Sequence, residues 1–180
     1  MKRQKRQVIA KRYMQYFAGQ IKTGGAKMEP KITNLNQFKI IGIKKRFKSE
    51  KQHYDNIWKE FMNYYDKIKM YSIDNAFYGI NFAHDENDVH DYIAGIAVEN
   101  NFQNPIDILV EHVQPSSLYA IFECTVNNIG ETYGMIFTKW INNGRYKIND
   151  KNIPCYDFYP PNTRSAEDKV LLYIPIIQNT

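Results

Sequence analysis

One acidic residue, Asp157, stands inside an aromatic segment near the C-terminal end of the chain. The segment, residues 153–159, is rich in β-branched and aromatic side chains and is predicted to be a strand. Because side chains alternate faces along a strand, Cys155 and Tyr159 share the face of Asp157, and the residues between them face the other way. A carboxylate buried alone is costly, so Asp157 needs a partner or water. A solvated strand face and an ion pair with a nearby lysine remain alternatives to a functional role.

Other residues that could do chemistry form weaker patterns. Five ionisable side chains that could attract a divalent metal fall within one short segment: His84, Asp85, Glu86, Asp88 and His90. The segment is a predicted hairpin loop, where solvated polar residues are common, so we predict no metal site. Glycine-rich phosphate loops and the G-x-S-x-G nucleophile motif are absent, and Cys124 and Cys155 lack metal-ligand spacing. We therefore predict no cofactor and no catalytic set.

The composition of the 180 residues is that of one domain with a sizeable core. Aromatic residues make up 14% of the chain, which suits a thick core or an aromatic-lined pocket. No apolar run approaches the roughly 20 residues that span a membrane. Without a secretory signal, the two cysteines are expected to be reduced thiols. These features predict a cytoplasmic protein with no membrane partner.

Charge divides the chain into two parts. Residues 1–27 carry eight Lys or Arg and no acidic residue, whereas residues 28–180 carry 16 basic and 19 acidic residues, a net charge of −3. We expect residues 1–27 to be dispensable for folding, as a mobile extension or as sequence upstream of a start at Met28. A basic extension could touch nucleic acid or an acidic surface. The mildly acidic part, in contrast, is expected not to bind nucleic acid directly.

The elements that would position Asp157 occur twice in the same order. In the first half the patterns predict a strand, a helix and two strands at residues 37–47, 50–70, 77–82 and 92–98. In the second half they predict the same order at residues 118–126, 131–141, 153–159 and 169–176, after a linker at 99–117. The sequence thus predicts an α+β domain over 28–180 built from two βαββ halves, about 31–99 and 116–177, related by a pseudo-twofold with one helix packed on each half-sheet. A cleft between such halves favours a ligand site.

Several short motifs follow one another in a fixed order over residues 28–180. They are Glu29-Pro30, Tyr78-Gly79-Ile80, Tyr92-x-Ala94-Gly95-x-x-Val98, Tyr119-Ala120-x-Phe122, Tyr133 through Trp140 with Gly144 and Tyr146, Pro154-x-Tyr156-Asp157-x-Tyr159, and Tyr173-Ile174-Pro175-Ile176. With these motifs the chain resembles the bacterial GyrI-like small-molecule-binding domain, also called the AraC-type effector-binding domain. The resemblance implies the same duplicated βαββ fold.

The resemblance also implies a ligand site around Asp157. In that family the penultimate strand usually carries a Glu at this position, in an aromatic cleft that takes cationic, lipophilic ligands. Asp keeps the charge and shortens the reach of the side chain. The candidate walls of the cleft are Tyr133, Trp140, Tyr78, Tyr119 and Tyr173. Each of them could instead pack in the core, as tryptophan at helical spacing usually does.

Three classes of function follow from the residues and the resemblance. The first is a stand-alone small-molecule binding protein that takes lipophilic, aromatic or cationic ligands for sensing, transcriptional regulation or sequestration. The second is a hydrolase of electrophilic small molecules, in which Asp157 with Tyr133 or Tyr119 would activate a water. The third is a protein-interaction module, such as a DNA gyrase inhibitor or the partner of a transcription regulator. We favour the first class because no catalytic set stands out.

Overall fold

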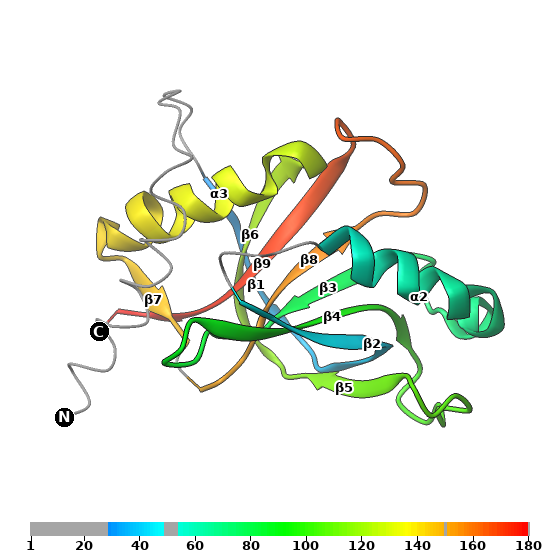
Figure 1. The fold of residues 1–180 in the computed structure, drawn as a ribbon. Coiled ribbons are helices and arrows are strands. Elements are labelled where there is room, and N and C mark those ends of the chain that lie inside the picture. The colour runs from blue at the N-terminus through cyan, green and yellow to red at the C-terminus, as the bar shows by residue number, and fades with distance from the viewer. Residues whose placement is uncertain (1–28, 49–53, 150, 180) are drawn as a thin grey trace.

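The computed structural model describes residues 29–48, 54–149 and 151–179. The predicted basic extension at 1–27 and the predicted beginning of the first helix at 50–53 lie outside the described residues. Within the described part, nine strands form one curved, open sheet (Figure 1). The strands are β1 Lys31–Leu35, β2 Phe38–Lys48, β3 Phe77–Asn81, β4 Val89–Val98, β5 Val110–Gln114, β6 Ser117–Thr125, β7 Tyr146–Ile148, β8 Cys155–Tyr159 and β9 Lys169–Gln178.

Two helices pack on this sheet. The helix α2 spans Tyr54–Ile68 and continues into a 3-10 turn at Lys69–Tyr71. The helix α3 spans Ile129–Met135 and continues into a π-helical stretch at Ile136–Trp140 and a 3-10 turn at Ile141–Asn143. Gly144 follows with a φ of 80°, the left-handed conformation that glycine adopts at a helix C-terminus. None of the helices in the described part of the chain is both long and apolar enough to span a membrane.

The order of the strands reveals the duplicated architecture. Across the sheet the order is β1-β6-β9-β8-β3-β4-β2-β5, with β7 also paired to β9, and every pairing is antiparallel. The unit β2-α2-β3-β4 is followed by the equivalent unit β6-α3-β8-β9. The two units meet where β3 pairs with β8, and there Gly79 lies directly opposite Asp157. The predicted α+β fold of two βαββ units related by a pseudo-twofold is confirmed.

Each helix has its own core. The apolar stripe of α2, with Ile57, Phe61 and Ile68 buried, packs against β2 and β4. Tyr133, Ile136 and Phe137 pack in the same way against side chains of β6 and β9. Figure 1 shows α2 and α3 lying apart, each over its own half of the sheet. A third cluster, centred on tyrosines, fills the opposite face of the sheet. The helices therefore flank the seam between the two units and do not form a bundle.

Three short strands, β1, β5 and β7, were not predicted from the sequence. β1 and β5 lie at the two ends of the main strand order, and β5 falls within the predicted linker. β1 pairs with β6 of the second unit although it precedes the first unit in the chain. Short strands with mixed polar residues have little intrinsic preference, and it is the neighbouring strand that stabilises them. The residue pattern along the chain does not indicate which strand will be the neighbour, so these strands could not be predicted from it.

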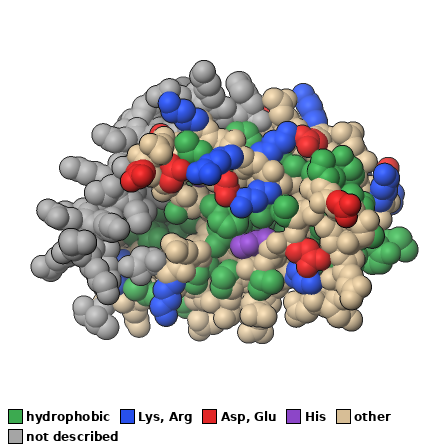
Figure 2. Space-filling model, turned by 60° about the horizontal axis from the view of Figure 1, so that its bottom comes forward, with side chains coloured by type: hydrophobic (Ala, Val, Ile, Leu, Met, Phe, Trp, Pro, Cys, Tyr) green, Lys and Arg blue, Asp and Glu red, His purple; other side chains and the backbone are tan. Residues whose placement is uncertain are grey.

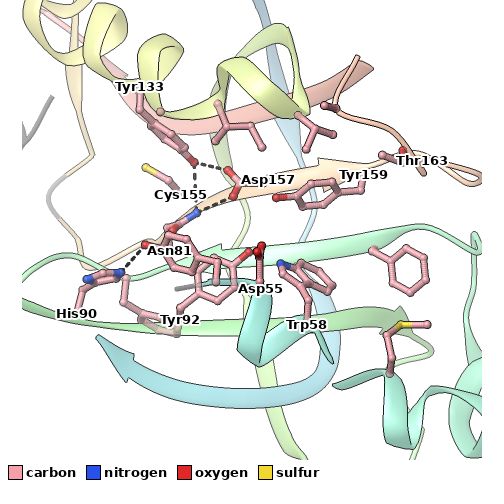
Figure 3. A pocket seen from close by; sticks show the side chains of 18 of the residues that line it. Asp55, Trp58, Asn81, His90, Tyr92, Tyr133, Cys155, Asp157, Tyr159 and Thr163 are labelled. Atoms are coloured by element: carbon pink, nitrogen blue, oxygen red, sulfur yellow. Dashed lines mark hydrogen bonds between the residues drawn. The ribbon is translucent and has the colours of Figure 1, made fainter. Parts of the chain in front are cut away.

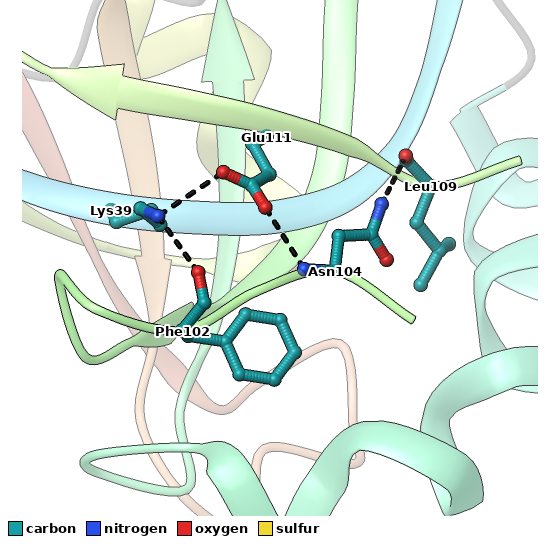
Figure 4. Close-up of polar contacts among 5 residues, drawn as sticks. All are labelled: Lys39, Phe102, Asn104, Leu109 and Glu111. Atoms are coloured by element: carbon teal, nitrogen blue, oxygen red, sulfur yellow. Dashed lines mark hydrogen bonds and ion pairs between the residues drawn. The ribbon is translucent and has the colours of Figure 1, made fainter. Parts of the chain in front are cut away.

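The connection before β5 is held by a polar network around Lys39 (Figure 4). The Nζ of Lys39 donates to the carbonyl oxygen of Phe102 at 2.9 Å and to Oε2 of Glu111 at 3.1 Å. The backbone N–H of Asn104 donates to Oε1 of the same Glu111 at 3.0 Å, and its side-chain Nδ2 donates to the carbonyl oxygen of Leu109 at 2.6 Å. The segment predicted as a linker is therefore bound to β2 and β5 by several hydrogen bonds.

The basic end of β2 is neutralised by acidic neighbours. Lys44 pairs with Asp91 at 2.8 Å and Arg46 pairs with Asp85 at 2.6 Å. Lys45 pairs with Glu60 of α2. On the face shown in Figure 2, basic and acidic side chains are interspersed among apolar ones. The basic run in the sequence therefore does not produce a matching excess of positive charge along this strand.

Candidate ligand-binding site

A cavity of about 800 Å³ lies over the seam between the two units. The first unit contributes residues of α2, β3, β4 and the β3–β4 loop, and the second contributes residues of α3, β8 and the β8–β9 loop. Apolar and aromatic side chains make up most of the lining. A volume of this size falls within the roughly 300–1,000 Å³ typical of pockets for small organic molecules.

Asp157 lies at the base of this cavity (Figure 3). Its side chain points to the cavity face together with Cys155 and Tyr159, as strand alternation predicts. The hydroxyl of Tyr133 donates to its Oδ1 at 2.6 Å, and Nδ2 of Asn81 donates to its Oδ2 at 3.1 Å. Asp157 is 4% exposed. The structure thus holds a buried carboxylate between two neutral donors that come from different units.

Burial governs the acidity of Asp157. Removal from water raises the pKa of its carboxyl group from 3.8 to about 6, and the hydrogen bonds from Tyr133 and Asn81 limit that rise. Among the described residues, no lysine or arginine forms an ion pair with it. The carboxylate is therefore mostly ionised at neutral pH, and no described residue places an opposite charge beside it.

Aromatic rings form the wall opposite α3. Trp58 of α2 lies edge-on to Phe77, Tyr92 and Tyr159, with ring centroids 6.1, 6.5 and 5.4 Å away. Tyr54, one turn earlier on α2, packs on Tyr92 at 4.6 Å. All five residues line the cavity. The rings offer faces and edges to a flat organic molecule, and a cation near ring faces is stabilised by their quadrupoles.

The close packing at the base of the cavity depends on Gly79. A Cβ atom at this position would lie 2.1 Å from the hydroxyl oxygen of Tyr92 and 3.2 Å from Oδ2 of Asp157. Glycine therefore leaves the space that the tyrosine hydroxyl and the carboxylate occupy. Because Gly79 faces Asp157 across the β3–β8 ladder, this space is part of the seam itself.

The two histidines of the polar segment 84–90, where no metal site was predicted, lie at another part of the lining. Nε2 of His90 is 2.8 Å from the hydroxyl of Tyr54, and the ring of His84 lies 4.3 Å from that of His90. Burial lowers the pKa of His90 to about 4, so its ring is neutral at physiological pH. Within the described ranges, no three His, Cys, Asp or Glu side chains are grouped as a metal site would require.

The structure brings together two of the six predicted site residues. Asp157 and Tyr133 share a hydrogen bond and line the cavity. Tyr78, Tyr119 and Tyr173 lie together on the opposite face of the sheet, around Tyr156. The Tyr119 hydroxyl, for example, donates to the carbonyl oxygen of Pro115 at 3.0 Å. These three tyrosines belong to the core of that face, away from Asp157.

Trp140, the sixth predicted residue, lies at the far end of the second helical segment. Its ring packs edge-on against Phe122 at 5.0 Å and stacks on Tyr146 at 5.8 Å. It packs on the core beneath α3 and does not line the cavity. The tryptophan that does line the cavity is Trp58 of α2.

Residues of the first unit were missed by the sequence-based prediction. Asn81, Trp58 and Tyr92 all line the cavity. Asn81 donates a hydrogen bond to Asp157, and Trp58 packs edge-on against Tyr92. One signal could have indicated Asn81. It stands two residues after Gly79, so it projects from the same face of β3 as the space beside Asp157. For Trp58, helical spacing indicates only the buried face of α2 and gives no sign of which end borders a cavity.

Replacement of Tyr133 by phenylalanine should raise the pKa of Asp157 above its value of about 6. The change removes the hydroxyl that donates to Oδ1 at 2.6 Å and leaves the ring in place. A hydrogen bond to a charged group contributes roughly 1.5–3 kcal/mol, so the expected rise is about one unit or more. Carboxyl ¹³C NMR titration of Asp157 measures it. Tyr146→Phe, outside the cavity, is the matched control, and an unchanged pKa in Tyr133→Phe would show that the hydroxyl contributes nothing.

An aromatic cavity of this size over the seam between two βαββ units is typical of a site for a small organic molecule. The family comparison agrees with a site of this kind. The family model described as the GyrI-like small molecule binding domain matches residues 28–177. The chain belongs to the GyrI-like family.

Solved structures share this fold at low sequence identity. A structure of SAV2435 bound to tetraphenylphosphonium has a TM-score of 0.63 at 16% identity and covers 83% of this chain and 94% of that chain. The EcmrR C-terminal domain has a TM-score of 0.60 at 11% identity, covering 85% and 99%. A hydrolase from Listeria innocua has a TM-score of 0.52 at 11% identity, covering 85% and 94%. No curated protein matches the chain. At these identities the likeness extends to the fold alone.

Proposed function

We propose that this protein binds lipophilic aromatic cations in the cavity, with Asp157 as the charged acceptor, and serves in sensing or sequestration. One observation carries the proposal. Asp157 is a buried carboxylate that lines a large cavity, and among the described residues its hydrogen-bond donors are the neutral groups of Tyr133 and Asn81. An ion pair in such a site would offset the desolvation that raises the pKa of Asp157.

The lining of the cavity supports a ligand that is both aromatic and cationic. The rings around Trp58 provide apolar contact and cation–π stabilisation, and the ionised Asp157 provides a charge in surroundings where water is largely excluded. Tetraphenylphosphonium, which the similar SAV2435 structure contains, is a ligand of this type. It is therefore a suitable first probe for this chain.

The test is the affinity of Asp157→Asn for tetraphenylphosphonium by calorimetry. Asparagine keeps the shape of the side chain and removes its charge. We expect the affinity to fall about ten- to a hundredfold, because a hydrogen-bonded or charge contact of this kind contributes roughly 1.5–3 kcal/mol. Asp107→Asn, an exposed site outside the cavity, is the control for net charge.

A neutral analogue, triphenylphosphine oxide, separates loss of charge from damage to the cavity. It should bind the wild type and Asp157→Asn with similar affinity. Equal losses for the cation and the neutral analogue would point to a distorted cavity. An unchanged affinity of Asp157→Asn for tetraphenylphosphonium would show that the charge of Asp157 does not contribute to binding.

For the folded domain we propose a protein partner, such as a transcription regulator, in preference to nucleic acid. The basic residues at the end of β2, Lys44 to Arg46, are each engaged by an acidic side chain. Charges already paired in this way release fewer counterions from a phosphate backbone and contribute less to binding it. One structure with the same fold is EcmrR bound to DNA, at 11% identity.

Hydrolysis is the second candidate function. It is favoured by the short hydrogen bond between Tyr133 and Asp157 and by the pKa of Asp157, because a carboxyl group that titrates near 6 can exchange protons near neutral pH. Tyr119 takes no part, since it lies on the other face of the sheet. Mass spectrometry of aromatic epoxides and esters incubated with wild type and with Asp157→Asn tests this activity. Turnover that persists in the variant would exclude Asp157 as the acid or base.

A further inference from the structure

The cavity carries charge at two depths. Asp157 is buried at its base, whereas Asp55 of α2 and Arg164 of the β8–β9 loop are exposed residues of its lining. Neither Asp55 nor Arg164 forms an ion pair with another residue of the described part. A ligand that fills the cavity from its base to its rim would therefore meet, at both ends, charges that no described residue pairs with.

The loop that carries Arg164 is held in place by its own hydrogen bonds. Oδ2 of Asp168 accepts from the backbone N–H groups of Arg164 at 2.6 Å and of Ser165 at 2.7 Å. These bonds also lower the pKa of Asp168. At the beginning of the loop, the backbone N–H and the hydroxyl of Thr163 both donate to the carbonyl oxygen of Pro160, at 3.1 and 2.8 Å. The loop is thus internally ordered on both sides of Arg164.

Two further bonds attach this loop to the start of the second helical segment. The backbone N–H groups of Val126 and Asn127 donate to the carbonyl oxygens of Asp168 at 3.1 Å and of Ala166 at 2.9 Å. A guanidinium on an anchored loop loses less conformational freedom when it pairs with a ligand than one on a loose loop. The backbone at Arg164 is consequently pre-organised beside the cavity.

The opposite rim charge is already stabilised. Asp55 stands in the first turn of α2, where the partial positive charge of the helix N-terminus favours a carboxylate. Arg164 has no such local compensation from a helix. Of the two rim charges, Arg164 is therefore the one that gains more from pairing with a ligand group of opposite sign.

We propose that the preferred ligands are zwitterionic: an aromatic cation held at Asp157 that also carries an anionic group, such as a carboxylate, placed at Arg164. This inference rests on the proposed function, because it assumes that the cationic part binds at the base. Arg164 then determines specificity. It favours amphoteric aromatic molecules over simple aromatic cations, and it disfavours a positively charged ligand group placed beside its guanidinium.

The matched probes are rhodamine 6G, a cationic ethyl ester, and its free acid, which has the same ring system and a carboxylate in place of the ester. Fluorescence anisotropy measures the affinity of both. We expect the free acid to bind the wild type about three- to fivefold more tightly, the size expected for an exposed ion pair. Arg164→Gln should abolish this preference, and Arg164→Lys should keep part of it.

Controls separate the rim contact from general effects. Arg145→Gln removes the same charge from an exposed site outside the cavity and should leave the preference intact. Asp157→Asn should weaken both dyes and leave their ratio near the wild-type value. The ratio should also fall as ionic strength rises, because exposed charges are screened.

The outcomes distinguish this inference from the function on which it rests. If both dyes bind through Asp157 but with equal affinity, or if the preference survives in Arg164→Gln, the zwitterion proposal is overturned and the cation site stands. If neither dye binds, or if Asp157→Asn affects neither, the proposed function falls, and the zwitterion proposal falls with it.

Discussion

A variant with Asp157 replaced by asparagine should be more stable than the wild type at neutral pH and equally stable in mild acid. The native pKa of Asp157 is about 6, against 3.8 for the unperturbed group. Between these values the native state binds more protons than the unfolded state, so stability falls as pH rises through this window. Each unit corresponds to about 1.4 kcal/mol, so the burial of the ionised group costs about 3 kcal/mol above the native pKa.

Denaturant unfolding of both proteins at about pH 4 and about pH 7 measures this difference. Asparagine can still accept from Asn81 if its amide group turns toward the hydroxyl of Tyr133, so the variant keeps the local packing. Other carboxyl groups titrate in both proteins, and subtraction removes their contribution. Asp107→Asn, at an exposed site outside the cavity, is the control for the change in net charge. A stability difference that does not vary with pH would mean that Asp157 is not buried as a charge.

Replacement of Gly79 by alanine should destabilise the fold and damage the cavity together. The added methyl group would lie 2.1 Å from Oη and 2.8 Å from Cζ of Tyr92, as well as 3.2 Å from Oδ2 of Asp157. Tyr92 is 2% exposed and packs against Tyr54 and Trp58, so its ring cannot move away freely. Overpacking of this kind typically costs about 1–3 kcal/mol.

A second substitution tests the cause of that loss. Tyr92→Phe removes the hydroxyl nearest to the new methyl group, so the double variant Gly79→Ala/Tyr92→Phe should recover part of the stability lost by Gly79→Ala alone. The recovery is only partial, because the ring carbon remains close. Unfolding of the four proteins gives the coupling between the two positions. If the two changes in the free energy of unfolding are strictly additive, the added methyl group does not clash with the hydroxyl of Tyr92.

Local patterns predicted the helices, the principal strands and the face of Asp157, because spacing along one element determines which side chains share a face. They failed where the answer depends on which strands are neighbours. Tyr173 lies opposite Tyr156 in the β8–β9 ladder and therefore projects away from Asp157, but that register is not visible in either strand alone. For Tyr78 the sequence did indicate that its side chain faces away from Asp157. Tyr78 occupies the position in its unit that Tyr156 occupies in the other, and Tyr156 is adjacent to Asp157 in the strand and so projects from the opposite face.

The cavity walls were harder to predict than the charge at its base. Trp58 and Trp140 both stand at helical spacing in aromatic segments, and both pack against the sheet side of their helices. The difference is that Trp58 borders the seam and Trp140 lies at the far end of its helical segment. Distance from the seam is a property of the assembled sheet, and neither propensity nor periodicity encodes it.

The pairing of Gly79 with Asp157 has a consequence for how such a site can arise. The two residues occupy equivalent places in the two units and face each other across the pseudo-twofold. One supplies the acid and the other supplies the empty volume beside it. Two acids there would oppose like charges across adjacent strands, and two glycines would leave no charge. A symmetric dimer of separate βαββ chains could not build this site, because one codon would have to encode both residues. Joining the units in a single polypeptide lets each half specialise.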